Sequence, residues 1–266
     1  MGLYESYRLH VSHVMHRFYI SPENWNRGAL ALTGSEAHHA RDVLRVRRGE
    51  KVVLFNGQGR EITAEIVDLT SDEIGLRKLH EAKTPPLQCR IVLGQAIPKG
   101  KNIELIVQKA VEIGAAEIAP IISDRTIVQV DTESAAQKQS RWQQIAIEAA
   151  KQCGQNWLPR VHTPKKLAEL FSAAAVESLD LRLIGSLQPG AQHLKKILAD
   201  YSSEHQHRPR SVLMLVGPEG DFTPAELALA RQYGCQPITL GPIILRVETA
   251  AIYCLSVLSY ELLIDW

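Results

Sequence analysis

The order of apolar and polar positions predicts two kinds of region along this chain. Near its start, the apolar residues 51–55 are followed by the turn Asn56-Gly57-Gln58-Gly59 and by residues 61–67, which alternate between apolar and polar. Alternation with a period of two is typical of a strand that is buried on one side only. We therefore predict a β-hairpin with one solvent-exposed face, preceded by a strand that begins near His16.

A helix is expected between these first strands. Ser35 is in position to cap its N-terminus, and Glu36 falls in its first turn. The basic residues within 45–48 lie near its expected end, where positive charge suits the helix dipole. The basic end of this helix is a candidate contact for phosphate.

Beyond the segment Thr84-Pro85-Pro86, the pattern changes to strands that alternate with helices. Paired prolines remove backbone donors and favour extended geometry, so we interpret this segment as an interdomain linker. Strands are predicted at residues 90–96, 117–122, 181–185 and 211–216. Helices are predicted at residues 103–111, 134–153, 164–175, 224–233 and 249–264, with another that ends near residue 201. This order is typical of an α/β domain with a parallel sheet.

The predicted organisation is therefore an N-terminal extension at residues 1–14, a small β-rich domain at residues 15–84 and an α/β domain at residues 87–266. The last predicted helix is apolar on nearly every side, with residues such as Ala251, Leu255 and Leu258. A helix of this kind has to be buried on several sides. Core packing accounts for part of this burial, and we expect a homodimer interface to account for the rest.

Composition places the chain among ordinary folded proteins. Its 266 residues carry 30 Lys and Arg against 29 Asp and Glu, and 45% of them are hydrophobic. This balance excludes disordered, collagen-like and disulfide-scaffold classes, and a formal charge of +1 gives no polycationic tail for nucleic acid. Any nucleic-acid contact must therefore be local.

Cysteine and histidine spacing argues against a metal site. Four cysteines lie far apart without a C-x-x-C pair, so we expect buried, reduced thiols. His10, His13 and His16 recur every three residues, but no carboxylate or cysteine completes a ligand set, and we predict no metal. Because the chain also has no apolar run long enough to span a membrane, we expect it to be cytoplasmic.

Charge is segregated inside the small domain. Residues 17–60 carry eight Lys or Arg and four Asp or Glu, whereas residues 61–84 carry three and six. A one-sided RNA contact needs this kind of segregation, although a solvated helix end produces it too.

Two late loops carry the candidate chemistry. Ligands of open α/β sheets bind at the carboxyl ends of the strands, so the segments after the last strands are the place to look. One loop, residues 216–222, has two glycines and a carboxylate before a predicted helix, and the other, residues 240–249, has a tight turn and an apolar stretch followed by Arg246. The loop at residues 185–190 is a candidate third wall. Dinucleotide-binding and P-loop fingerprints are absent, which argues against a dehydrogenase or an NTPase.

These loops carry a resemblance to a known family. The segments Gly217-Pro218-Glu219-Gly220, Leu240-Gly241-Pro242 with Ile244-Leu245-Arg246 and Glu248-Thr249-Ala250, and Arg141-Trp142 with residues 147–152 resemble the RsmE family of 16S rRNA uridine-N3 methyltransferases. The similarity extends upstream to Lys99, Lys101, Glu104, Lys109, Glu112 and Gly114, and to Arg17-Phe18, His38-His39, Val43-Leu44-Arg45 and Gly57 with Gly59. It covers nearly the whole chain from Met15 onward.

The resemblance implies a PUA-like domain followed by a SPOUT-type α/β domain with a C-terminal trefoil knot. It also implies a homodimer, and S-adenosylmethionine as the cofactor. The residues that it implies for cofactor binding are Leu187, Gly217, Pro218, Glu219, Gly220, Leu240, Gly241, Pro242, Ile244 and Leu245. The residues that it and the basic charge imply for binding of 16S rRNA in the small ribosomal subunit are Arg17, Arg41, Arg45, Arg47 and Arg48.

Catalysis of this kind requires alignment of donor and acceptor and removal of the proton on uracil N3. Our hypothesis is that Arg246 stabilises negative charge on a uracil carbonyl, while Glu248 or Glu219 removes the proton or orients the arginine. The alternative is that both carboxylates only cap helix N-termini.

Three positions depart from the usual family pattern: Asp221 stands where glycine is common, Ile243 where a basic residue is common and Gln155 where arginine is common. Two other functions therefore stay open. One is a SPOUT enzyme that methylates another base or a ribose, and the other is an RNA-binding assembly factor without turnover.

Overall fold

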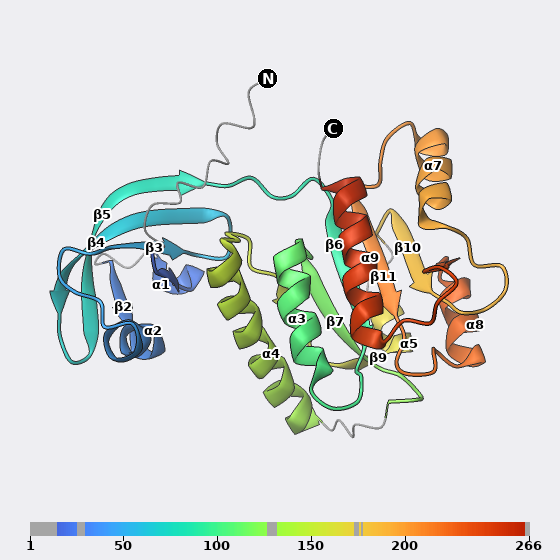
Figure 1. The fold of residues 1–266 in the computed structure, drawn as a ribbon, viewed down its shortest axis with the longest axis horizontal. Coiled ribbons are helices and arrows are strands. Elements are labelled where there is room, and N and C mark those ends of the chain that lie inside the picture. Colours follow the sequence, from blue (N-terminus) through green and yellow to red (C-terminus); the bar gives the residue numbers. More distant parts are fainter. Residues whose placement is uncertain (1–14, 26–29, 127–131, 173–175, 177, 264–266) are drawn as a thin grey trace. The chain divides into compact units, whose positions relative to one another are not determined.

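The computed structural model describes residues 15–25, 30–126, 132–172, 176 and 178–263. The chain divides into two compact units, unit 1 at Met1–Thr84 and unit 2 at Pro85–Trp266 (Figure 1). Each unit has its own hydrophobic core, and each is described by itself below.

Unit 1 is built on a five-stranded sheet with the strand order β1-β3-β4-β5-β2. Its strands are β1 (Arg17–Tyr19), β2 (Ala31–Thr33), β3 (Lys51–Phe55), β4 (Arg60–Leu69) and β5 (Glu73–Lys83). β1 runs parallel to β3, and the other neighbours are antiparallel. The predicted hairpin is confirmed as β3 and β4. The buried Asn56 holds its turn, because its side-chain oxygen accepts from the backbone N–H groups of Gln58 and Arg60 at 2.9 and 3.0 Å.

The helix of unit 1 differs from the prediction. α1 (Pro22–Trp25) is a single turn, and α2 (Gly34–His38) continues into a π-helical segment, His39–Val43. Ser35 lies inside α2, and Thr33 occupies the N-cap position without a capping side-chain hydrogen bond. The predicted cap was therefore wrong. The basic residues within 45–48 do lie near the helix end, since the helix stops at Val43 with Leu44 as its C-cap and Arg45 follows with a φ of 54°.

Unit 2 contains a seven-stranded parallel sheet with the order β12-β10-β11-β6-β7-β8, and β9 pairs with β7. Its strands are β6 (Arg90–Ala96), β7 (Glu117–Ile122), β8 (Arg160–Val161), β9 (Lys165–Lys166), β10 (Leu181–Gly185), β11 (Ser211–Val216) and β12 (Gln236–Ile238). The four predicted strands coincide with β6, β7, β10 and β11. The parallel α/β class is confirmed by the pairing of these strands.

Helices pack on this sheet and place its loops. They are α3 (Asn102–Ile113), α4 (Thr132–Cys153), α5 (Leu167–Phe171), α7 (Leu194–His205), α8 (Pro224–Gln232) and α9 (Val247–Leu262). In Figure 1, α3 and α9 lie next to one another in front of the sheet, and their residues are in contact. α5 and α8 share an apolar cluster with β6 and β11 that includes Phe171, Leu227 and Leu215.

Helix boundaries confirm some expectations and correct others. Thr223 and Glu226 form a capping box at the start of α8, as their spacing predicts. α5 is shorter than the predicted helix at residues 164–175, of which the last three lie outside the described residues. α9 starts two residues earlier than expected, which puts Glu248 in its first turn.

Three of the four free cysteines are buried, and burial raises the pKa of the Cys89, Cys235 and Cys254 thiols to about 12. Cys153 is exposed at the end of α4, contrary to the expectation that all four are buried. Within the described residues, no helix is long and apolar enough to cross a membrane, and no group of three His, Cys, Asp or Glu side chains is placed to hold a metal ion. His10 and His13 lie outside the described residues.

Candidate functional site

Three loops of unit 2 meet at one edge of the sheet. They follow β12, β10 and β11, which are neighbours in the strand order, and all parallel strands end at the same edge. A backbone contact joins the loop after β10 to the end of β12, because Ser186 donates its N–H to the carbonyl of Ile238 at 3.0 Å. We call residues 186–190, 217–222 and 239–245 the three site loops. This edge is where ligands of open α/β sheets bind.

Gly217 allows the loop after β11 to turn tightly. A Cβ atom at this position would lie 3.2 Å from Asp221 Oδ1 and from the backbone nitrogen of Phe222. A side chain here would force the loop away from the helix that follows. Pro218 and Phe222 are buried, so the loop is anchored on the core and presents Glu219 and Gly220 to solvent.

Asp221 ties two site loops together. Its φ is 69°, a left-handed conformation that favours glycine and that Asp and Asn tolerate better than other residues. Its carboxylate accepts from the N–H of Leu187 at 3.2 Å and from that of Phe222 at 2.8 Å. Asp221 therefore keeps the backbone conformation that glycine favours, and its carboxylate adds a hydrogen bond to the loop after β10.

Glu219 binds a backbone amide and does not cap a helix. Its two carboxylate oxygens lie 3.1 and 3.4 Å from the backbone nitrogen of Lys99, in the loop between β6 and α3. The N-cap of the next helix, α8, is Thr223. The capping alternative for Glu219 is therefore wrong, and the carboxylate joins the loop after β11 to the loop after β6.

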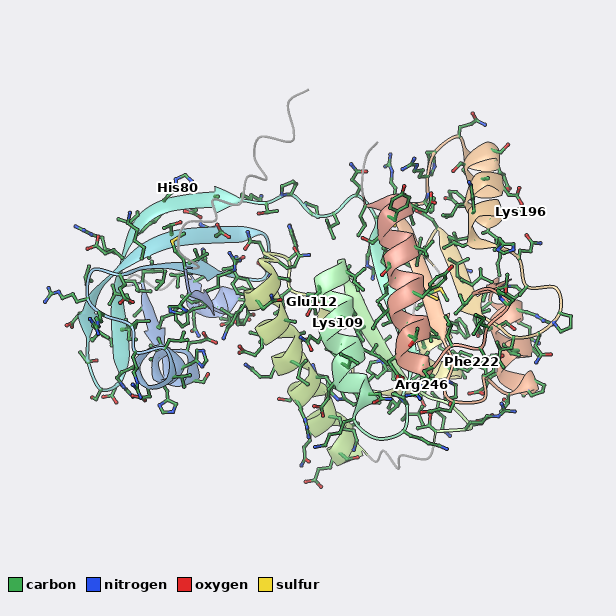
Figure 2. The ribbon with its side chains drawn as sticks, in the orientation of Figure 1. His80, Lys109, Glu112, Lys196, Phe222 and Arg246 are labelled. Atoms are coloured by element: carbon green, nitrogen blue, oxygen red, sulfur yellow. The ribbon has the colours of Figure 1, made fainter. Side chains whose placement is uncertain are left out.

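The start of α9 carries the candidate catalytic residues. Arg246 is exposed at the N-cap position, and its backbone carbonyl accepts from Ala250 at 2.8 Å. It forms no ion pair within the described residues. Glu248 accepts through Oε2 from the Asn102 side chain at 3.2 Å, which joins the first turns of α9 and α3. Figure 2 labels Arg246 near the start of α9 and Phe222 in the loop after β11.

The loop before α9 exposes apolar surface. Ile243 and Ile244 are 73% and 77% exposed, and Leu187 in the loop after β10 is 60% exposed. Gly241 has a φ of 109°, and its N–H reaches Thr239 Oγ1 at 3.3 Å. Leu240 and Leu245 are half-buried, whereas Pro242 is exposed. Exposed aliphatic side chains beside backbone polar groups fit a flat heteroaromatic ring such as adenine.

Sequence reasoning missed a fourth loop, after β7. Arg125 Nη1 contacts the backbone carbonyls of Gly220 and Asp221, the latter at 3.2 Å. The backbone N–H of Asp124 donates to the buried Glu226 carboxylate at 3.0 Å. Arg125 lies three residues after the end of β7, so the same rule about strand ends that pointed to the other loops was a usable signal.

The five candidate RNA-binding arginines of unit 1 fall into two groups. Arg17 is ion-paired with Glu61 at 2.8 Å and only 16% of its side chain is exposed, and Arg41 binds Asp42 at 2.9 Å. Arg45, Arg47 and Arg48 are exposed and form no ion pair within the described residues. The second group follows the π-helical segment and has its charge available to a ligand.

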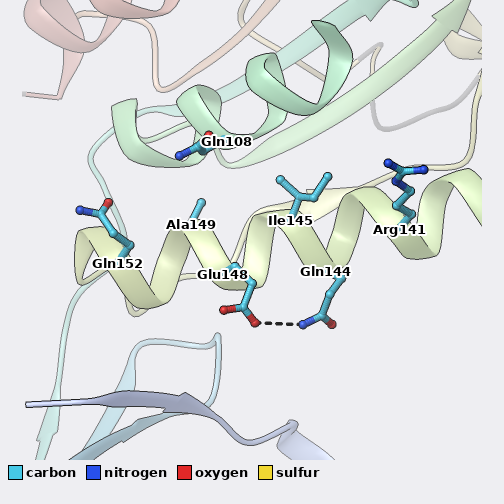
Figure 3. A pocket seen from close by; sticks show the side chains of 7 residues that line it. All are labelled: Gln108, Arg141, Gln144, Ile145, Glu148, Ala149 and Gln152. Atoms are coloured by element: carbon cyan, nitrogen blue, oxygen red, sulfur yellow. Dashed lines mark hydrogen bonds between the residues drawn. The ribbon is translucent and has the colours of Figure 1, made fainter. Parts of the chain in front are cut away.

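The α4 motif lies apart from the site loops. Arg141, Glu148, Ala149 and Gln152 line a groove between α3 and α4 (Figure 3). Gln155 is half-buried after the helix, and its side-chain oxygen lies 3.4 Å from the Trp157 backbone nitrogen. The motif therefore has a location of its own, which the cofactor loops do not explain.

Family comparisons agree with this architecture. Residues 85–259 match the family described as an RNA methyltransferase domain, and residues 32–79 match the RNA methyltransferase PUA domain. The chain is 30% identical to the ribosomal RNA small subunit methyltransferase E of Bacillus subtilis (strain 168), over 87% of this chain and 90% of that relative.

Two solved structures are similar over nearly the whole chain. One is a ribosomal RNA small subunit methyltransferase E from Neisseria gonorrhoeae bound to S-adenosyl methionine, with a TM-score of 0.79 and 33% identity over 93% of this chain and 98% of that one. The other is a methyltransferase from Legionella pneumophila in complex with the bound cofactor SAM, with a TM-score of 0.81 and 33% identity over the same shares.

Proposed function

Because the chain belongs to the ribosomal RNA small subunit methyltransferase E family, we propose that it transfers a methyl group from S-adenosylmethionine to N3 of a uridine in 16S rRNA. The observation that supports this most directly is the meeting of three site loops beside an unpaired, exposed Arg246. A ribosomal substrate places the reaction in the cytoplasm. The trefoil knot implied by the resemblance stays a prediction.

The residues of the site loops fit S-adenosylmethionine. Gly217 leaves room for a tight loop, and the space beside Gly241 is open, since a Cβ there would meet no heavy atom within 4 Å. Leu187, Ile244 and Leu245 would cover the faces of the adenine, and backbone groups of the loops would bind its edge. When bound, the cofactor supplies a methyl group that is already activated by its sulfonium.

Arg246 and Glu248 then act on the uracil. The arginine lies at the N-terminus of α9 and stabilises the negative charge that develops on a uracil carbonyl when N3 loses its proton. Glu248 is two residues away in the same helical turn and accepts one hydrogen bond, through Oε2, from Asn102. It is the better candidate base, because Glu219 uses its carboxylate to position the Lys99 loop.

Arg45, Arg47 and Arg48 hold the RNA backbone. Uracil N3 lies on the pairing edge, so the target must be unpaired or turned out of its stack, and contacts to the backbone orient it. Reversing the charge of Arg45 and Arg48 should weaken RNA binding and reduce its salt dependence. Unchanged affinity and salt slope would remove these residues from the interface.

A homodimer explains the exposed side of α9. Thr249, Tyr253, Ser256 and Tyr260 follow one another at helical spacing and are all exposed, with Tyr253 and Tyr260 at 47% and 55%. Sedimentation analysis should give a dimer for the wild type and a shift toward monomer for Tyr253→Glu. A monomeric wild type would contradict the dimer.

Transfer of labelled methyl from S-adenosylmethionine to small ribosomal subunits that lack the modification tests the proposed reaction. Digestion of the RNA should place the label in 3-methyluridine. Label in another base or in a ribose would point to a different reaction of the same site. Cofactor binding without any label would point to a different RNA substrate, whereas a chain that binds no S-adenosylmethionine in a calorimetric titration would favour an assembly factor. The left-handed Asp221 preserves the loop conformation and gives the assembly factor no support.

A further inference from the structure

A groove between α3 and α4 has features that the methyl-transfer site does not use. Gln108 of α3 lines it together with Arg141, Gln144, Ile145, Glu148, Ala149 and Gln152 of α4, and we call it the α3–α4 groove (Figure 3). The α4 residues recur at spacings of three and four, so they share one face of the helix. The groove measures about 540 Å³, within the range of about 300–1,000 Å³ that small-molecule sites occupy.

The glutamines of α4 are used in two different ways. Gln139 and Gln143 donate from Nε2 to the carbonyls of Val161 and Pro159, each at 3.0 Å, and so fix β8 and the segment before it to the helix. Gln152 on the groove face is exposed, and so is Gln108 across from it. Neither of these two side chains has a hydrogen-bond partner within the described residues. Their amides are therefore free to bind a ligand.

The groove combines an apolar floor with polar edges. Ile145 is half-buried and Ala149 is buried, and both side chains face the groove in Figure 3. Arg141 Nη2 is fixed at one end by Glu104 Oε1 at 2.6 Å. Gln144 donates to Glu148 Oε1 at 3.1 Å. This arrangement presents an apolar surface with amide, guanidinium and carboxylate groups around it.

We propose that the α3–α4 groove binds an unpaired nucleobase of the RNA substrate, apart from the nucleotide that is methylated. This inference rests on the proposed function. Free glutamine amides offer a donor and an acceptor side by side, which matches the edge of a base, and the apolar floor contacts its flat face. A site for phosphate would need surplus positive charge, but Arg141 is paired with Glu104 and Lys151 with Glu148. The groove is therefore suited to a base and not to the sugar–phosphate backbone.

Single and combined substitutions of the free amides test this inference. For Gln108→Ala with Gln152→Ala, we expect about tenfold weaker binding of small ribosomal subunits that lack the modification, since one good base contact has that order of effect. The KM for subunits should rise, whereas turnover at saturating subunits and the affinity for S-adenosylmethionine should stay as in the wild type. Gln232→Ala is the matched control, an exposed glutamine at the end of α8, and should change nothing.

Photo-crosslinking identifies the occupant of the groove. With p-benzoylphenylalanine in place of Gln144, we expect a crosslink to rRNA in the complex of the full chain with the small subunit. A crosslink only to a ribosomal protein or to a second copy of this chain would overturn the inference, as would the absence of any crosslink to RNA. Subunit affinity that is equal for the double variant and the wild type would overturn it too.

Different results would contradict the groove inference and the proposed reaction. Subunit affinity and crosslinking measure binding and need no methyl transfer, unlike KM and turnover. If the wild type methylates rRNA and the Gln108 and Gln152 variants bind it normally, only the groove inference is wrong. If the wild type transfers no methyl group but the variants lose RNA affinity, the proposed reaction is wrong and the groove remains an RNA-binding site.

Discussion

Glu219 and Asp221 at one edge of the unit 2 sheet and Glu117 at the other use their carboxylates differently. At the carboxyl edge, Glu219 and Asp221 accept hydrogen bonds from backbone amides of Lys99 and Leu187 in neighbouring loops. At the amino edge, Glu117 accepts from two side chains, Arg90 Nε at 2.7 Å and His162 Nε2 at 2.7 Å. Carboxylates that bind backbone amides fix loops and leave nearby cations unpaired, whereas carboxylates that bind cations neutralise them.

This difference leaves a cation available at the carboxyl edge, where we place the site, and pairs one at the amino edge. Arg246 at the carboxyl edge remains available to a ligand, while Arg90 at the amino edge is paired with Glu117. Hydrogen bonds from His162 and Arg90 hold the pKa of the Glu117 carboxyl below its usual value, even though burial raises it. We expect substitutions at the carboxyl edge to change activity or cofactor binding, and those at the amino edge to change stability.

The largest effect is expected from Arg246→Ala. Loss of a cation that stabilises developing charge should lower the rate of methyl transfer about 10²- to 10³-fold. Affinity for S-adenosylmethionine should stay within a few-fold of the wild type, since the three site loops are intact. Single-turnover transfer and calorimetric titration measure the two quantities. Arg90→Ala is the control at the other edge and should retain transfer while losing thermal stability. Unchanged transfer in Arg246→Ala would contradict its role.

Gly217→Ala is expected to have the next largest effect. The new methyl group would lie 3.2 Å from Asp221 Oδ1 and from the backbone nitrogen of Phe222, so the loop must shift. Overpacking of this kind costs about 1–3 kcal/mol, and we expect S-adenosylmethionine to bind about tenfold more weakly. Gly154→Ala is the comparison: its φ of 81° strains a side chain, but it lies at the end of α4, so this variant should lose stability and keep its cofactor affinity. Equal cofactor affinity in both variants would show that the loop tolerates the shift.

Much of this architecture was predictable, and the reason lies in the central strands. β6, β7, β10 and β11 consist mainly of buried apolar residues, and a continuous apolar run of strand length is a strong signal. β8 and β9 have two residues each, too few for a pattern. No local spacing in the sequence pattern indicated the π-helical segment at His39–Val43.

The candidate site was predictable in its residues but not in its contacts. The loops that contain Gly217 and Gly241 stood out because they follow strands. The bond between Glu219 and Lys99 joins residues 120 positions apart, and the role of Asp221 depends on a loop 34 positions away. Such contacts depend on strand order, which the sequence pattern did not specify. The proposed roles of Arg246 and Glu248 stay predictions.

Asp221→Gly is expected to have a smaller and two-sided effect. Glycine relieves the cost of a φ of 69°, but the variant loses the hydrogen bonds to the Leu187 and Phe222 amides. We expect the free energy of unfolding to change by less than about 1 kcal/mol and the affinity for S-adenosylmethionine to fall a few-fold. Urea denaturation and titration measure these effects. Unchanged affinity for S-adenosylmethionine would show that cofactor binding does not need the hydrogen bond between Asp221 and the Leu187 amide.

The smallest effect is expected at the amino edge, from pH. The pKa of Glu117 is lowered in the folded chain, so its contribution to stability is fully present above its unfolded pKa of about 4.3 and is lost as pH falls through the folded value. A partly exposed group of this kind contributes about 1 kcal/mol or less. Urea midpoints between about pH 6 and pH 3 should therefore fall less steeply for Glu117→Gln than for the wild type. Glu204→Gln, at an exposed position on α7, should follow the wild type. Parallel curves for Glu117→Gln and the wild type would show that the amino edge does not depend on this carboxylate, and the contrast between the two edges would then rest on the carboxyl edge alone.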